Sequence, residues 1–196
     1  MKFITAFFLH STTNRARQGR ITLMPANIEI KARLRDLADL RKRAEALSDT
    51  PVQVIPQEDT FFNTPRGRLK LRQLDPQRGQ LVYYERNDAA GPKRSNYLIA
   101  EIPDTSALKA ALTAALGVRG VVRKTRYLYM VGQTRLHLDE VEGLGQFMEL
   151  EVVMRPGQDD AEGQAIAHDL MTKLGVAEAD LLEGAYMDLL EKRLLT

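Results

Sequence analysis

The 196-residue chain contains no cysteine. This absence excludes disulfide bonds, thiolate nucleophiles, cysteine-ligated zinc and iron–sulfur clusters. It is compatible with a reducing compartment, and we expect a cytoplasmic protein. The three histidines, His10, His137 and His168, are too scattered in the sequence to indicate a zinc centre.

Long apolar runs are also missing. No run approaches the roughly 20 residues that span a bilayer, so we expect no membrane partner. The first ten residues contain a short apolar stretch behind Lys2, but no small-residue cleavage pattern follows it, and we predict no signal peptide. We interpret residues 1–24 as a poorly ordered N-terminal extension, with Met24 as a candidate start. Residues 25–196 are expected to form a single domain.

The chain has almost no net charge. Lysine and arginine number 28 against 26 aspartates and glutamates, which gives +2, and 44% of the residues are hydrophobic. Such a composition is typical of a folded globular protein rather than a disordered one. Nonspecific nucleic-acid binders usually carry a clear basic excess, so we expect no nucleic-acid partner. Any functional charge must therefore be local.

Several common site motifs are absent. The sequence has no Gly-Lys dipeptide and hence no Walker A loop, and it has no G-x-G-x-x-G, G-x-S-x-G or H-E-x-x-H. These absences exclude the phosphate-binding loop, the dinucleotide-binding fingerprint, the nucleophile elbow and the zinc-protease helix.

Apolar and polar residues alternate with a period of two over much of the chain, which predicts β-strands. In residues 26–34, for example, Ile28 and Ile30 face one way while Glu29 and Lys31 face the other. Strands are predicted over residues 26–34, 52–63, 68–74, 80–87, 96–103, 119–131, 134–142 and 146–154. Helices are predicted over residues 36–48, 105–116, 158–174 and 178–193. Because most connections are of hairpin length, we expect a mainly antiparallel sheet.

The polar face of one strand after another is cationic. An isolated face of this kind is ordinarily a solvated surface. Its recurrence on five strands is different, because the cations would repel one another unless an anion or carboxylates compensated them. The residues concerned are Lys31, Arg33, Lys70, Arg72, Arg86, Lys124, Arg126 and Arg135.

Carboxylates occur in the same phase as these cations. Glu29 and Asp139 lie on strands that carry them, and Glu149 and Glu151 form an E-x-E pair with both side chains on one face, about 7 Å apart. Such a pair is either a solvated strand edge or a cation site. Oxygen ligands of this type select a hard metal ion such as Mg²⁺ or Mn²⁺.

Cations and paired carboxylates on one concave surface suit a polyphosphate–metal complex. The cations would bind nonbridging phosphate oxygens, and the carboxylates would hold the metal ion. This chemistry needs few nucleophilic side chains, because the protein positions the substrate and stabilises charge. The pattern therefore favours a site for a polyphosphate–metal complex.

Eight segments, taken in order, carry a resemblance to a known family. They are NIEIKAR (27–33), QEDTFF (57–62), GRLKLR (67–72), LVYYER (81–86), VVRKTR (121–126), RLHLDEVEGLG (135–145), FMELEVV (147–153) and GAYMDLLEK (184–192). Over roughly residues 26–192 the chain resembles the CYTH superfamily of triphosphate tunnel metalloenzymes, in particular its class IV adenylyl cyclase-like group.

The resemblance implies an α+β fold, in which an eight-stranded antiparallel closed β-barrel with a polar lumen is flanked by helices. Polar strand faces would then point inward and apolar faces outward, an inversion that closed barrels allow. The family signature on the first strand is E-x-E-x-K. Here it reads N-I-E-I-K, so Asn27 replaces the first glutamate and offers only a neutral carbonyl oxygen, a weaker ligand for Mg²⁺.

The resemblance also implies a set of site residues. The implied triphosphate contacts are Lys31, Lys70, Arg72, Arg86, Lys93, Lys124, Arg126 and Arg135. The implied ligands of Mg²⁺ or Mn²⁺ are Glu29, Asp139, Glu149 and Glu151, which together with Lys31 form the expected catalytic set. Lys93 and Arg94 fall in the predicted loop after the fourth strand, where we expect them to close over the ligand. For His137, a structural and a catalytic role both stay open.

The implied reaction converts ATP to cyclic AMP and pyrophosphate. The same side chains would serve a triphosphatase that hydrolyses inorganic, thiamine or nucleoside triphosphate. Asn27 also keeps open a noncatalytic polyphosphate-binding sensor. The C-terminal helix is expected to pack on the barrel or against a second subunit, which leaves a homodimer open.

Overall fold

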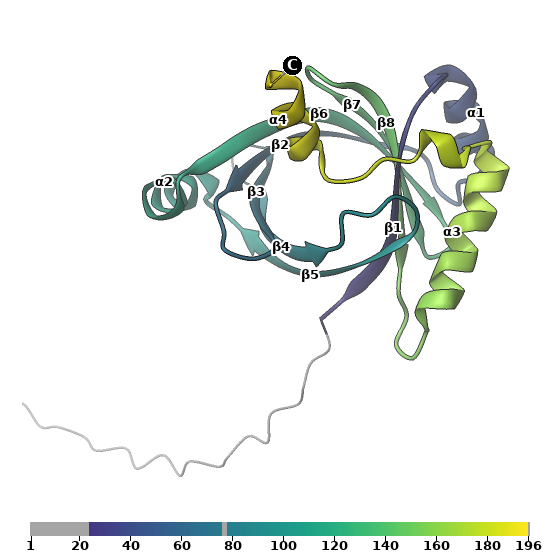
Figure 1. Ribbon diagram of the computed structural model, residues 1–196, viewed down its shortest axis with the longest axis horizontal. Helices are drawn as coiled ribbons and strands as arrows, with labels where there is room; N and C mark the ends of the chain where they lie inside the picture. Colours follow the sequence, from purple (N-terminus) through teal and green to yellow (C-terminus); the bar gives the residue numbers. More distant parts are fainter. Residues whose placement is uncertain (1–23, 76–77, 196) are drawn as a thin grey trace, which may run out of the picture.

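The computed structural model describes residues 24–75 and 78–195, and its centre is a closed β-barrel (Figure 1). Around the barrel the strands follow the order β1-β5-β4-β3-β2-β6-β7-β8, and every neighbouring pair is antiparallel. The strands are β1 (Ala26–Arg33), β2 (Gln53–Phe62), β3 (Arg68–Asp75), β4 (Arg78–Arg86), β5 (Lys93–Ile102), β6 (Val118–Val131), β7 (Thr134–Val141) and β8 (Gly145–Val153). The eight-stranded antiparallel barrel is thus confirmed. Apart from Met24, the expected N-terminal extension lies outside the described residues.

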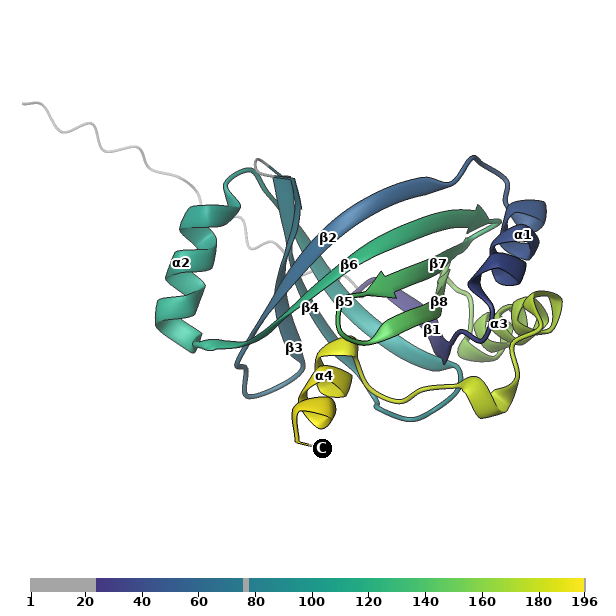
Figure 2. The same ribbon diagram turned by 90° about the horizontal axis from the view of Figure 1, so that it is seen from above.

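The helices lie outside the barrel. They are α1 (Leu37–Leu47), α2 (Thr105–Leu116), α3 (Asp160–Leu174) and α4 (Tyr186–Leu194). Asp36, Asp104 and Asp159 cap the first three by accepting hydrogen bonds from backbone N–H groups of the first turn. α1 and α3 lie together on one side of the barrel, and α2 lies on the other side, against β2–β4 (Figure 2). None of the helices within residues 24–75 and 78–195 is long and apolar enough to cross a bilayer.

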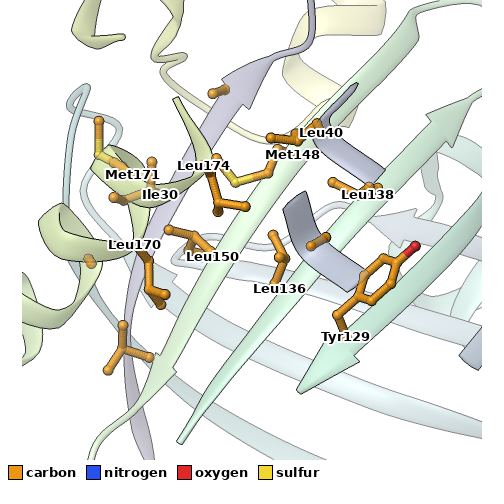
Figure 3. Packing of buried hydrophobic residues seen from close by; sticks show 14 of the residues in the cluster. Ile30, Leu40, Tyr129, Leu136, Leu138, Met148, Leu150, Leu170, Met171 and Leu174 are labelled. Atoms are coloured by element: carbon orange, nitrogen blue, oxygen red, sulfur yellow. The ribbon is translucent and has the colours of Figure 1, made fainter. Parts of the chain in front are cut away.

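The main hydrophobic core lies between the barrel wall and the helices α1 and α3 (Figure 3). Alternate residues of β1, β7 and β8 point outward into it and are almost fully buried. They are Ile28, Ile30, Leu136, Leu138, Met148, Leu150 and Val152, and the helices add Leu40, Leu170, Met171 and Leu174. Because the apolar faces of these strands face outward, their polar faces must line the lumen.

The C-terminal segment differs from the predicted helix over residues 178–193. Only a short 3₁₀ turn covers Glu178–Asp180, and helix α4 does not begin until Tyr186. In between, Leu181 forms a β-bridge with Ala32, and the Leu182 N–H donates to the carbonyl oxygen of Lys31 at 2.8 Å. These backbone bonds to β1 hold the segment out of a helix, which the local sequence pattern could not indicate.

The start of β5 also differs from the prediction. Lys93 and Arg94 belong to this strand rather than to a loop, because their backbone pairs with Glu29 and Ile28 of β1 where the barrel closes. Arg94 points away from the lumen and pairs with Asp160 of α3 at 2.5 Å. The expectation that both residues close over a ligand from a loop was therefore wrong, although Lys93 itself is buried.

Candidate functional site: a charged tunnel through the barrel

The lumen contains a cavity of about 370 Å³, lined by alternate residues of all eight strands together with Ala185 and Tyr186. Seven of the eight expected triphosphate contacts line this cavity, and Lys93 lies beside it on β5. Three of the four expected metal ligands, Glu29, Glu149 and Glu151, line it as well. The strands therefore bring together residues that are more than 100 positions apart in the sequence.

One carboxylate on β2 holds two lumen cations. Asp59 accepts hydrogen bonds from Lys70 Nζ at 2.8 Å and from Arg72 at 2.9 and 3.1 Å, and only 2% of its surface is exposed. Burial alone would raise the pKa of Asp59, but the positive charges of Arg72 and Lys70 outweigh it and keep the pKa well below its usual range. Asp59 was not among the expected site residues.

A second buried carboxylate, Asp139 on β7, is fully surrounded by donors. Arg126 donates to both its oxygens at 2.7 and 2.6 Å, and Lys124 donates at 2.8 Å. The hydroxyl of Tyr186 donates a further hydrogen bond at 3.0 Å. With these donors in place, Asp139 holds Lys124 and Arg126 of the neighbouring strand β6 in position.

Tyr186, at the start of α4, also reaches into the lumen and was missed by sequence reasoning. The Lys31 ammonium lies 3.5 Å from the centre of its ring, and the ring of Phe147 lies 5.1 Å away. These two aromatic residues form an apolar cluster with Phe61, Val122 and Met187 at the end of the barrel where α4 begins. The C-terminal segment is thus part of the tunnel wall.

Replacing Tyr186 by phenylalanine is expected to lower the free energy of unfolding by about 1–2 kcal/mol, because it removes a buried hydrogen bond to a carboxylate but keeps the ring. Urea unfolding would measure the change. Tyr83→Phe is the matched control, since the Tyr83 hydroxyl donates to Glu85 in an exposed pair. Equal stabilities of Tyr186→Phe and wild type would contradict the structural role.

The acidic side of the lumen is formed by β1 and β8. Glu29 lies opposite Glu151 in the strand register, and Lys31 lies opposite Glu149. Arg86 donates to Glu29 at 2.6 Å, and Arg135 donates to Glu151 at 2.8 Å, while Glu149 contacts both Lys31 and Arg126. Burial, together with the nearby charges of Glu151 and Glu149, raises the pKa of Glu29 despite the opposing charge of Arg86.

His137 on β7 lies beside the same carboxylates. Its Nδ1 is 3.9 Å from an oxygen of Glu149 and 3.8 Å from an oxygen of Glu151, and one ligand atom from each of the three residues lies within 4.8 Å of the other two. Burial, reinforced by the charge of Arg126, lowers the pKa of His137 to about 3, so its imidazole is neutral. This set of donors fits a divalent cation.

Asn27 occupies the position of the family's first glutamate and is 3% exposed. With its amide oxygen turned toward β7, it accepts a hydrogen bond from Arg135 Nη2 at 3.0 Å, and its nitrogen donates to the carbonyl of Ala26 at 3.2 Å. Asn27 is therefore a neutral partner of Arg135, and Glu151 supplies the charge that balances this arginine.

Positive charge exceeds negative charge in and around the cavity. The eight expected triphosphate contacts stand against five carboxylates, Glu29, Asp59, Asp139, Glu149 and Glu151, which leaves three positive charges. Burial lowers the pKa of Lys31 and of Lys70 to about 8, and neighbouring arginines add to the shift. A bound anion would offset this excess.

The end of the lumen that lies opposite Tyr186 is apolar. Strand registers place Ile55, Leu74, Ile99 and Leu128 around it, with Gln80 and Arg135 between them. Ile99 is 48% exposed, so this end opens to solvent. The tunnel thus has a charged middle and an open mouth with apolar walls.

The comparisons with known proteins agree with this geometry. A family model, described as the CYTH domain, matches residues 25–186. The chain belongs to the CYTH family. CYTH proteins are adenylyl cyclase-like or triphosphatase enzymes that bind triphosphates and depend on a metal ion.

Individual relatives cover most of the chain. Adenylate cyclase CyaB of Aeromonas hydrophila is 27% identical over 187 residues, which is 90% of this chain and 92% of CyaB. The solved structure of the PH1012 protein from Pyrococcus horikoshii OT3 matches with a TM-score of 0.73 and 27% identity, over 83% of this chain and 98% of that one. HpAC1 of Hippeastrum, studied as an adenylyl cyclase and found to have a dominant triphosphatase activity, matches with a TM-score of 0.55 and 17% identity, over 78% of this chain and 89% of its own.

Proposed function

We propose that this CYTH protein binds the triphosphate of ATP along its lumen and converts ATP to cyclic AMP and pyrophosphate with Mg²⁺ or Mn²⁺. The observation that carries the proposal is the lumen itself, in which an excess of buried cations faces a group of carboxylates. A buried excess of lysine and arginine is costly without an anion. A triphosphate is long enough to contact cations on several strands at once.

The proposal assigns the lumen side chains to two tasks. The triphosphate oxygens are bound by Lys31, Lys70, Arg72, Arg86, Lys93, Lys124, Arg126 and Arg135. Glu29, Glu149 and Glu151 would hold the metal ion, which when bound neutralises phosphate charge and orients the phosphates. The expected role of Asp139 as a ligand stays a prediction, and its donors Arg126, Lys124 and Tyr186 favour a role in orienting cations.

In the proposed reaction the ribose 3′-hydroxyl loses its proton to water and its oxygen attacks the α-phosphorus, while the bond from that phosphorus to the oxygen that bridges it to the β-phosphorus breaks. Pyrophosphate then leaves with additional negative charge. Arginines and lysines already aimed into the lumen stabilise this charge without rearrangement. The apolar mouth formed by Ile55, Leu74, Ile99 and Leu128 supports a substrate with an organic group, because a purine ring would bury apolar surface there. The likeness to CyaB supports the same choice.

The second candidate is a triphosphatase, in which water attacks the terminal phosphorus. The same cations and carboxylates would serve this reaction. The position of the substrate along the tunnel would decide which phosphorus is attacked, and therefore which of the two reactions occurs. The observation that favours it is the shared barrel of HpAC1, whose dominant activity is triphosphatase.

Product analysis separates these reactions. Purified protein would be incubated with ATP, inorganic triphosphate or thiamine triphosphate, each with Mg²⁺ or Mn²⁺, and the products would be separated by chromatography. A cyclase yields cyclic AMP and pyrophosphate from ATP, and EDTA abolishes the reaction. Orthophosphate from inorganic triphosphate would instead favour the triphosphatase. Binding of all three without turnover would contradict both and leave a polyphosphate sensor.

The affinity for inorganic triphosphate is expected to fall as the pH rises through about 8. The pKa of Lys70 is lowered to about 8 in the free protein, so this lysine loses its charge above that pH, whereas an ordinary lysine stays charged to about 10. Binding of the anion would raise the pKa again, so complex formation should take up protons near pH 8.5. Calorimetry in buffers of different ionisation enthalpy measures both effects. Lys70→Arg should flatten the fall, and an affinity that is constant between pH 7 and 9.5 would contradict the assignment.

A further inference from the structure

His137 is a buried polar side chain whose Nδ1 has no hydrogen-bond partner in the described part of the chain. The side chain is 3% exposed, and Nδ1 is directed at the gap between Glu149 and Glu151. A buried nitrogen without a partner costs free energy, so such atoms are rare in native proteins. An atom of this kind that faces two carboxylates indicates a missing ligand between them.

The spacing of the three groups fits a shared metal ion better than hydrogen bonds. Nδ1 lies 3.9 and 3.8 Å from the nearest oxygens of Glu149 and Glu151, which is too far for a hydrogen bond. Two ligands bonded to one ion at about 2.1 Å lie roughly 3.0–4.2 Å apart, depending on the angle between them. Both distances fall within that range.

The two carboxylates differ in their neighbouring contacts. Oε2 of Glu149, the oxygen nearest Nδ1, also accepts a hydrogen bond from Arg126, so an ion bound there would share this oxygen with the arginine or displace it. Arg135 donates to Oε2 of Glu151, and the other oxygen, Oε1, is the one that faces His137. Glu149 lies directly opposite His137 in the β7–β8 register, so both side chains project from adjacent strands into the same part of the lumen. Asn27, by contrast, is engaged with Arg135 and the Ala26 carbonyl.

We propose that His137 is a nitrogen ligand of the metal centre in this chain, alongside Glu149 and Glu151. Because imidazole nitrogen binds first-row transition metals better than it binds Mg²⁺, the centre should prefer Mn²⁺, Fe²⁺ or Co²⁺ over Mg²⁺. The inference deepens the proposed function. It rests on that function only for what the bound metal ion does in the reaction, because binding of the ion itself can be measured without substrate. In a chain with Asn27 at the first signature position, His137 would add a ligand to the proposed set of Glu29, Glu149 and Glu151.

The test is a spectrum of the bound metal. Protein without a histidine tag would receive one equivalent of Mn²⁺, and electron spin-echo envelope modulation would be recorded. Modulation from a directly bonded ¹⁴N nucleus is expected, and it should change when the protein is prepared with ¹⁵N-labelled histidine. His137→Gln should abolish this modulation and weaken Mn²⁺ binding by about 10- to 100-fold, while Mg²⁺ binding changes much less. His168→Gln is the matched control, because His168 is exposed on α3.

The outcomes are distinguishable from those of the proposed function. Bound Mn²⁺ without ¹⁴N modulation in wild-type protein would overturn the inference, whatever the turnover of ATP. Nitrogen modulation in a protein that turns over no triphosphate would support the inference and contradict the enzyme assignment. The wild-type and ¹⁵N spectra decide the question even if His137→Gln does not fold.

Discussion

Replacing Glu149 by glutamine is expected to lower kcat for the triphosphate substrate by about 10²- to 10³-fold. Glu149 contacts Lys31 and Arg126 and lies beside His137, so it contributes to the position of two cations and belongs to the proposed metal centre. Glutamine keeps the shape of the side chain but removes its charge. Product chromatography under saturating substrate would measure the loss.

The Michaelis constant gives this prediction a second readout. Without the charge of Glu149 the lumen becomes more positive, so the triphosphate should bind at least as tightly, and KM should not rise. A simple loss of folded protein would also lower the apparent kcat but would leave KM unchanged, so a KM below the wild-type value separates the two explanations. Glu142→Gln, at an exposed position after β7, is the matched control and should keep wild-type kinetics. Wild-type turnover in Glu149→Gln would show that the carboxylate takes no part in the reaction.

Replacing Asp59 by asparagine is expected to lower the free energy of unfolding by about 3–5 kcal/mol. Asp59 holds Lys70 and Arg72 at 2.8 and 2.9 Å, and the substitution would leave these two partly buried cations without the Asp59 carboxylate. Urea denaturation measures the loss. Asp39→Asn is the control, because its pair with Arg43 on α1 is exposed and should contribute no more than about 0.5 kcal/mol.

Ligand binding should compensate part of this loss. Inorganic triphosphate would supply negative charge beside Lys70 and Arg72, so it should raise the melting temperature more in Asp59→Asn than in wild type. An Asp59→Asn protein that is as stable as wild type without ligand would contradict the pairing. Equal shifts in the two proteins would contradict the position of the anion beside these cations.

Much of the barrel could be predicted because apolar and polar residues alternate strictly along its strands. Ile28 and Ile30 pack outward against α3, while Glu29 and Lys31 line the lumen, as their phase indicates. Alternation alone does not tell which face is inside, however. The inward direction of the charged face followed from the resemblance to the CYTH family, and the structure now confirms it.

The parts of the site that were missed depend on contacts between distant segments. Asp59 is a single carboxylate in the sequence QEDTFF, and its importance emerges only when the register places it opposite Arg72. Tyr186 was assigned to a packing helix, because the sequence does not show that Leu181 and Leu182 bond to β1 and bring the tyrosine to the lumen. Lys93 was placed in a loop because its strand partner, Glu29, is about 60 residues away.

A crystal structure of the protein with inorganic triphosphate and Mn²⁺ would test the account most directly. We expect the triphosphate along the lumen beside Lys70 and Arg72 of β3 and Lys124 and Arg126 of β6, with an anomalous peak for Mn²⁺ beside Glu149 and Glu151. Triphosphate bound only to the outer surface of the barrel, with the lumen ion pairs unchanged, would contradict it.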